Sequence, residues 1–97
     1  MVDDRACARL WAGQWARQGY AAAAIRQKLS TKGLETRVVD AAVATLDEAE
    51  DDRARARLLI DARLRRGWAP RERLARWLAA RGFDAEVIEH TLPHDEE

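Results

Sequence analysis

The chain has 97 residues with 17 basic and 17 acidic side chains, so its length allows one compact domain or two very small domains that share a core. Its formal net charge of zero argues against attraction of the whole molecule to nucleic acid or to acidic membranes. No apolar stretch approaches the ~18–20 residues of a membrane-spanning helix and the amino terminus has no signal-peptide pattern, so we expect a cytoplasmic protein without a membrane partner.

Three helices are predicted in the first half of the chain. The first should stop near Gly19, and its apolar stripe consists of Cys7, Ala8, Trp11 and Trp15. The second runs from about residue 21 to residue 31 and ends at Gly33, which is placed as a left-handed cap. A short third helix is predicted over residues 36–46, and its apolar positions include Val38, Val39, Val43 and Leu46.

The second half predicts three more helices. A fourth helix over about residues 51–66 ends at Gly67, and Pro70 suits the first turn of a fifth helix because its missing amide would be unpaired there. The fifth helix closes before Gly82, and Asp84 can cap a short sixth helix. The acidic residues 47–52 either extend the fourth helix backwards or form a solvated linker.

Matched positions indicate an internal repeat. Gly19 and Gly67 are 48 residues apart, and Gly33 and Gly82 are 49 apart. A period of this size, with one longer and two short helices per unit, is typical of helical repeat proteins. We therefore predict an all-α fold of tandem three-helix repeats, with six helices in two units at residues 1–48 and 49–97.

The predicted core combines aliphatic residues with tryptophans. Each of the four tryptophans can bury ~150–250 Å², so Trp11, Trp15, Trp68 and Trp77 are all expected in the core first. The residues expected to be largely buried are Trp11, Ile25, Leu29, Val39, Leu59, Leu74, Trp77, Leu78 and Ile88.

Residues typical of catalytic or metal sites do not form a convincing pattern. His90 and His94 have a metal-ligand spacing, but Pro93 lies between them, so no metal site is predicted. Cys7 lies on the apolar stripe without a nearby histidine base, which favours a buried inert thiol. With no glycine-rich phosphate loop either, the sequence predicts a non-enzyme without a catalytic site, a cofactor or a small-molecule substrate.

An excess of arginine is the strongest remaining signal. Residues 53–81 contain ten arginines against only Asp61 and Glu72. The arginine fork suits carboxylate or phosphate, so the excess indicates an acidic partner surface. The plainer alternative is surface charge pairing, since Arg57, Asp61 and Arg65 share a helix face. The predicted partner-binding residues are Arg57, Arg63, Arg65, Arg66, Arg71, Arg73, Arg76 and Arg81.

The order of these motifs resembles the RecX family of regulatory proteins. The resemblance rests on residues 3–11 (DDRACARLW), Gly19 with Tyr20, residues 25–34 (IRQKLSTKGL) and residues 78–88 (LAARGFDAEVI). It covers nearly the whole chain, from Asp3 to Leu92. It implies tandem three-helix repeats and a non-enzymatic protein that lodges in the groove of the RecA–DNA filament and limits ATP hydrolysis and strand exchange.

Two departures from the family pattern keep other functions open. Members usually carry three repeats, whereas this chain begins where the second would begin, and residues 21–24 replace a glycine-containing turn. One alternative is a small helical nucleic-acid-binding module that acts without RecA, with arginines on the DNA phosphate backbone. A helical scaffold is another. The leading hypothesis remains a modulator whose partner is the RecA recombinase filament.

Overall fold

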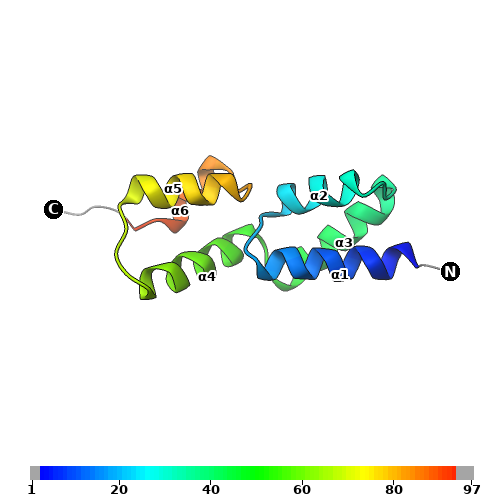
Figure 1. The fold of residues 1–97 in the computed structure, drawn as a ribbon, viewed down its shortest axis with the longest axis horizontal. Coiled ribbons are helices and arrows are strands. Elements are labelled where there is room, and N and C mark those ends of the chain that lie inside the picture. The colour runs from blue at the N-terminus through cyan, green and yellow to red at the C-terminus, as the bar shows by residue number, and fades with distance from the viewer. Residues whose placement is uncertain (1–2, 94–97) are drawn as a thin grey trace.

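Six helices joined by short turns make up the molecule (Figure 1), a computed structural model that describes residues 3–93. They are α1 (Asp4–Arg17), α2 (Ala22–Thr31), α3 (Thr36–Ala49), α4 (Asp52–Arg65), α5 (Arg71–Ala80) and α6 (Ala85–Thr91). Residues 3–93 contain no strand. The prediction of an all-α fold with two three-helix units is therefore confirmed.

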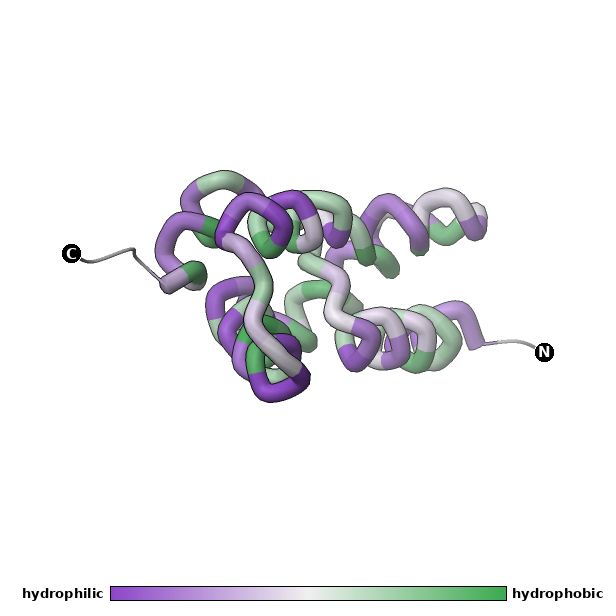
Figure 2. The backbone as a smooth tube through the Cα atoms, turned by 60° about the vertical axis from the view of Figure 1, so that its left-hand side comes forward, coloured by the Kyte–Doolittle hydropathy of each residue, from purple (hydrophilic) through white to green (hydrophobic). Residues whose placement is uncertain are grey.

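The first unit closes α1, α2 and α3 around an aliphatic core. Each of these helices packs against the other two. Ala8 and Ala12 are fully buried, and these small side chains let α1 approach Ile25 and Val39 closely. The cluster consists of Ala8, Ala12, Ile25, Leu29, Val39, Ala42 and Val43. The backbone view in Figure 2 shows hydrophobic and hydrophilic residues alternating along the helices, as helices with one buried face require.

The second unit repeats this arrangement with α4, α5 and α6. Here α6 packs against both α4 and α5. The buried cluster contains Ala56, Ile60, Ala69, Leu74, Leu78, Phe83, Val87, Ile88 and Leu92. It also contains Ala21, which precedes α2 and belongs to the first half of the chain. The two cores are thus separate clusters, but the second is completed by a residue from the first unit.

The helix ends follow from specific residues. The Asp84 carboxylate accepts a hydrogen bond from the Val87 amide at 2.9 Å, which confirms the predicted cap of α6. Gly33 and Gly82 lie just beyond α2 and α5 with φ of 85° and 98°, the left-handed conformation expected of both. The predicted end of the third helix at residue 46 is wrong, because α3 continues to Ala49. No glycine or proline interrupts residues 46–49, so the helix runs on through the first half of the acidic block.

The tryptophan prediction is wrong for Trp68, whose exposed fraction is 83%. It follows Gly67 in the turn between α4 and α5, which lies at one end of the molecule (Figure 1). Trp11, Trp15 and Trp77 are half-buried against the cores, as is Leu59, rather than fully enclosed. The remaining predicted core residues are buried, namely Ile25, Leu29, Val39, Leu74, Leu78 and Ile88.

The two units lie one after the other along a single long axis (Figure 1). The molecule measures 58 × 22 × 21 Å and its radius of gyration is 14.7 Å. A compact domain of this length would have a radius of gyration of about 12.5 Å. The start of α1 and the α2–α3 turn lie at one end, and the α4–α5 turn lies at the other. Both ends are therefore far from the contact between the units.

Candidate partner-binding surfaces

Two of the predicted binding arginines are held by contacts within the second unit. The Arg63 guanidinium donates to the Gly67 carbonyl at 3.1 Å and so closes the end of α4. The Arg71 guanidinium donates to the Glu89 carboxylate at 2.9 Å and to the Pro93 carbonyl at 2.7 Å. These contacts tie α5 to the end of α6, so both arginines contribute to the fold.

Arg81 lies between the two units. Its guanidinium donates to the Gln18 carbonyl, and its own carbonyl accepts from the Ala21 amide at 2.9 Å. The guanidinium carbon also lies 5.2 Å from the centroid of the Tyr20 ring and 5.5 Å from that of Trp77. Stacking of this kind is favourable between arginine and an aromatic face. Arg81 thus joins the turn after α1 to the turn after α5.

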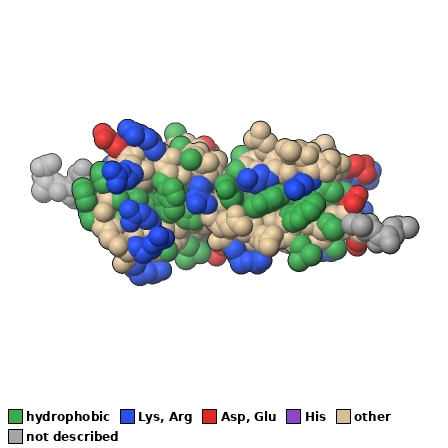
Figure 3. Space-filling model, viewed as in Figure 1, with side chains coloured by type: hydrophobic (Ala, Val, Ile, Leu, Met, Phe, Trp, Pro, Cys, Tyr) green, Lys and Arg blue, Asp and Glu red, His purple; other side chains and the backbone are tan. Residues whose placement is uncertain are grey.

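The other five predicted arginines are exposed. None of the ion pairs within residues 3–93 involves them, so the expected Asp61–Arg65 pairing is not formed. Figure 3 shows basic side chains gathered over the half of the molecule that contains α4 and α5. We call Arg57, Arg65, Arg66, Arg73 and Arg76 the exposed arginines.

The sequence prediction missed Arg55, which is only 3% exposed. Its guanidinium donates to the Asp52 carboxylate at 2.6 Å, to the Asp47 carboxylate at 3.2 Å and to the Glu50 carbonyl. The Asp52 carboxylate also accepts from the Ala22 amide at 2.9 Å, which links the start of α4 to the start of α2. The sequence contained a pattern that indicates this burial, because Arg55 precedes Leu59 by four residues and so lies on the same helix face.

We use the word seam for the whole contact between the units. It comprises residues 18–22 and Ala24 of the first unit with Asp52, Arg55, Leu59, Arg81 and Gly82 of the second. The acidic block contributes Asp47 from α3 and Asp52 from α4 to the network around Arg55. This block is therefore neither a backward extension of α4 alone nor a solvated linker.

A group of aromatic rings beneath lysines marks the first unit, and it was also not predicted. The Lys28 ammonium lies 4.4 Å from the Tyr20 centroid and 5.6 Å from that of Trp15. The Lys32 ammonium lies 5.0 Å from the Trp11 centroid. Figure 3 shows hydrophobic side chains flanked by basic ones over this half of the molecule. The rings are thus both packed on the core and covered in part by cations.

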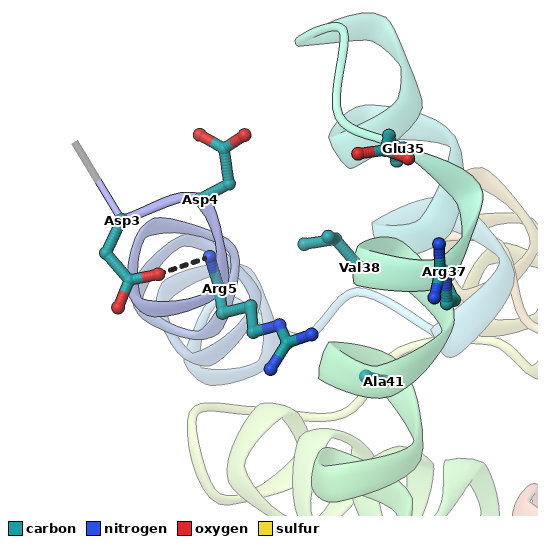
Figure 4. A pocket seen from close by; sticks show the side chains of 7 residues that line it. All are labelled: Asp3, Asp4, Arg5, Glu35, Arg37, Val38 and Ala41. Carbon is teal, nitrogen blue, oxygen red and sulfur yellow. Dashed lines mark hydrogen bonds between the residues drawn. The ribbon is translucent and has the colours of Figure 1, made fainter. Parts of the chain in front are cut away.

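An open depression lies between the start of α1 and the start of α3 (Figure 4). It is lined by Asp3, Asp4, Arg5, Glu35, Arg37, Val38 and Ala41. The Asp3 carboxylate accepts from the Arg5 amide at 3.1 Å, while the Arg5 side chain extends toward α3. Five of these seven residues are charged, with both signs present, so the depression differs from the mainly hydrophobic pockets that hold small molecules.

Residues 3–93 contain no group of three or more histidine, cysteine or acidic side chains placed to hold a metal ion. His94, one of the two histidines considered from the sequence, lies outside the described residues. Cys7 is a free thiol and is half-buried. No helix in the described part of the chain is long and apolar enough to cross a membrane.

The fold and its surfaces define a small tandem helical repeat protein whose exposed features are charged and aromatic surfaces. Residues 3–43 match the model of the second three-helix domain of RecX. Over 80 residues the chain is 42% identical to the regulatory protein RecX of Thermus thermophilus, which covers 80% of this chain and 54% of that protein. Over 90 residues it is 32% identical to the regulatory protein RecX of Serratia proteamaculans, covering 91% of this chain and 54% of the relative. No solved structure matches.

The chain is a homologue of the RecX regulatory proteins, and the resemblance seen in the sequence is confirmed. It spans about half the length of the curated relatives that it matches. These relatives are named as regulatory proteins rather than as enzymes. The division at residues 48 and 49 and the binding role of the arginines stay predictions.

Proposed function

We propose that this chain is a non-enzymatic regulatory protein of the cytoplasm that binds the RecA recombinase filament and lowers its ATP hydrolysis and strand exchange. The observation that carries the proposal is the similarity to proteins named regulatory protein RecX over 80–91% of the chain. The RecX resemblance implies the RecA–DNA filament as the partner. The proposal requires no cofactor and no small-molecule substrate.

The exposed arginines supply the contact surface in this proposal. A guanidinium without an intramolecular carboxylate can bind a carboxylate of a partner protein or a DNA phosphate with two parallel hydrogen bonds. Arg73 and Arg76 lie on α5 and are exposed. The 58 Å length of the molecule allows contact with neighbouring subunits of a filament.

The first experiment measures DNA-dependent ATP hydrolysis by RecA as the purified chain is added. A concentration-dependent decrease in the hydrolysis rate is expected. An unchanged rate at large excess over RecA would contradict the proposed function.

The second experiment asks whether Arg73 and Arg76 carry the binding. The double variant Arg73→Glu/Arg76→Glu should lose binding to the filament and remain folded, because exposed helix positions usually change stability by less than about 0.5 kcal/mol. The control Arg9→Glu/Arg37→Glu changes the net charge equally at exposed positions of the first unit and should bind nearly as well as the unaltered chain. Equal losses in both variants would reduce the effect to general electrostatics.

A titration on DNA alone, at two salt concentrations, separates this proposal from a module that binds nucleic acid by itself. Weak binding without RecA supports the regulatory role. Tight binding with a steep dependence on salt would instead indicate direct contacts to many phosphates.

A further inference from the structure

The seam is packed closely enough to require glycine at two positions. A Cβ built on Gly82 would lie 2.7 Å from the Ala24 Cβ, closer than real Cβ contacts come. A Cβ built on Gly19 would overlap the Leu59 side chain. The turn after α1 thus lies directly on the second unit, and the turn after α5 lies directly on the first.

The same two turns recur at the two ends of the molecule, where the glycines are not closely packed against other described residues. Gly67 corresponds to Gly19 and Gly33 corresponds to Gly82 in the repeat. A Cβ built on either Gly67 or Gly33 meets no described atom within 4 Å. One end of the molecule therefore carries one half of a seam, and the opposite end carries the complementary half (Figure 1).

The end at the α4–α5 turn exposes a large apolar side chain, that of Trp68. Trp68 follows Gly67 as Tyr20 follows Gly19, but it is 83% exposed. It borders a shallow depression with Leu64, Pro70 and Pro93. In the seam, by contrast, Tyr20 is half-buried beneath Arg81. The charged residues Arg71 and Glu72 also line this depression. An exposed tryptophan with charged neighbours is typical of a surface that a partner covers.

The opposite end offers the matching groups. Asp4 corresponds to Asp52, Trp11 to Leu59 and Lys32 to Arg81, each 48 or 49 residues earlier. Because Asp52 accepts from the Ala22 amide in the seam, Asp4 is placed to accept from the amide of Arg71, the residue that corresponds to Ala22. Lys32 lies over Trp11 and is exposed beside Gly33.

We propose that a second copy of this chain stacks head to tail on the first, so that the Gly67–Trp68 turn of one copy lies on Trp11, Lys32 and Gly33 of the next. The contact continues the long axis and repeats the seam between molecules. Because the two contacting surfaces differ, each copy keeps one free end, and the expected products are open chains rather than a closed dimer.

Sedimentation of the purified chain over a range of concentrations tests this contact without RecA, so its failure leaves the proposed function untouched. The mean mass should rise above the monomer mass of 11.0 kDa as the concentration increases. A mass that stays at the monomer value up to about 1 mM would overturn the proposal, since a dissociation constant above that value corresponds to less than about 4 kcal/mol of binding free energy.

Two variants and their mixture test the head-to-tail geometry. Trp68→Ala blocks one end and Asp4→Arg blocks the other, so each variant alone should remain monomeric. Mixed in equal amounts they should form dimers and nothing larger, because each supplies the end that the other lacks. Leu58→Ala, which removes an exposed apolar side chain in the middle of α4, is the control and should associate like the unaltered chain.

Association that persists in both single variants would place the contact elsewhere. A mixture that stays monomeric would equally contradict a contact between unlike ends. Circular dichroism of each variant shows whether it is folded. Both variants should fold normally, because both altered side chains are exposed.

Discussion

Arg55 shows how a charged residue can occupy a core position of a small protein. A buried guanidinium is tolerated only when hydrogen bonds replace its water. Asp47, Glu50 and Asp52 supply those bonds to the two terminal nitrogens, whereas the buried Nε has no partner among the described residues. Both carboxylates keep part of their surface in solvent. The network therefore fixes the path of the chain from α3 into α4, and through Asp52 it also orients α2.

Replacement of this arginine is expected to destabilise the protein. Arg55→Met keeps the length of the side chain but leaves two carboxylates close together without their cation, which should lower the free energy of unfolding by about 2 kcal/mol. Urea denaturation measures the change. Arg57→Met, two positions later and exposed, is the control and should change stability by less than about 0.5 kcal/mol. Similar effects of the two substitutions would contradict the structural role of Arg55.

Individual residues were predictable where local chemistry decides their environment and unpredictable where neighbours decide it. Asp84 caps α6 because of its position before the helix, and this was read correctly from the sequence. Arg55 was counted with the other arginines, although its burial depends on Asp47 from the preceding helix. Trp68 was expected in the core on its size alone, whereas its place in the α4–α5 turn leaves it exposed.

At the scale of the elements, most of the helices and turns were predicted correctly from the sequence. Six helices, their order and the glycine closures followed from apolar spacing and repeated motifs. The end of α3 was not predicted correctly, because residues 47–49 were assigned to the acidic segment between the helices. In the structure only Glu50 and Asp51 separate α3 from α4. The two closing turns that contain Gly33 and Gly82 look alike in sequence but differ in their surroundings.

A pair of substitutions measures that difference. Both Gly33→Ala and Gly82→Ala place a side chain at positive φ, which costs about 1 kcal/mol in each case. Gly82→Ala also forces Ala24 to move, since its Cβ would be 2.7 Å away, and should cost about 1–3 kcal/mol more. Thermal unfolding of both variants gives the comparison. An equal loss of stability in the two variants would show that Ala24 can move away from the new side chain without lowering the stability further.

At the scale of the whole molecule, two three-helix units share a seam and lie along one axis. The repeat and the family resemblance could both be inferred from the sequence, because both depend on the order and spacing of its motifs. It did not predict which arginines stay exposed. Arg63, Arg71 and Arg81 are engaged by partners 4, 18 and 63 residues away in the chain, and the two long separations become contacts only after folding.

The two units are not equally independent. The buried cluster of the first unit contains only residues of α1, α2 and α3, whereas that of the second includes Ala21. We expect a fragment of residues 1–50 to retain much of its helical structure and a fragment of residues 51–97 to retain much less. Far-ultraviolet circular dichroism of the two peptides tests this expectation. A more helical second fragment would contradict the importance of Ala21 and Asp52 at the seam.

This asymmetry has a consequence for synthesis on the ribosome. The amino-terminal unit emerges first, and proteins generally fold in that order as they are made. Its own core is complete once α3 has left the exit tunnel, and it then presents Ala21 and the amide of Ala22 to the residues that follow. We therefore expect the nascent second unit to fold against the surface of a first unit that is already folded.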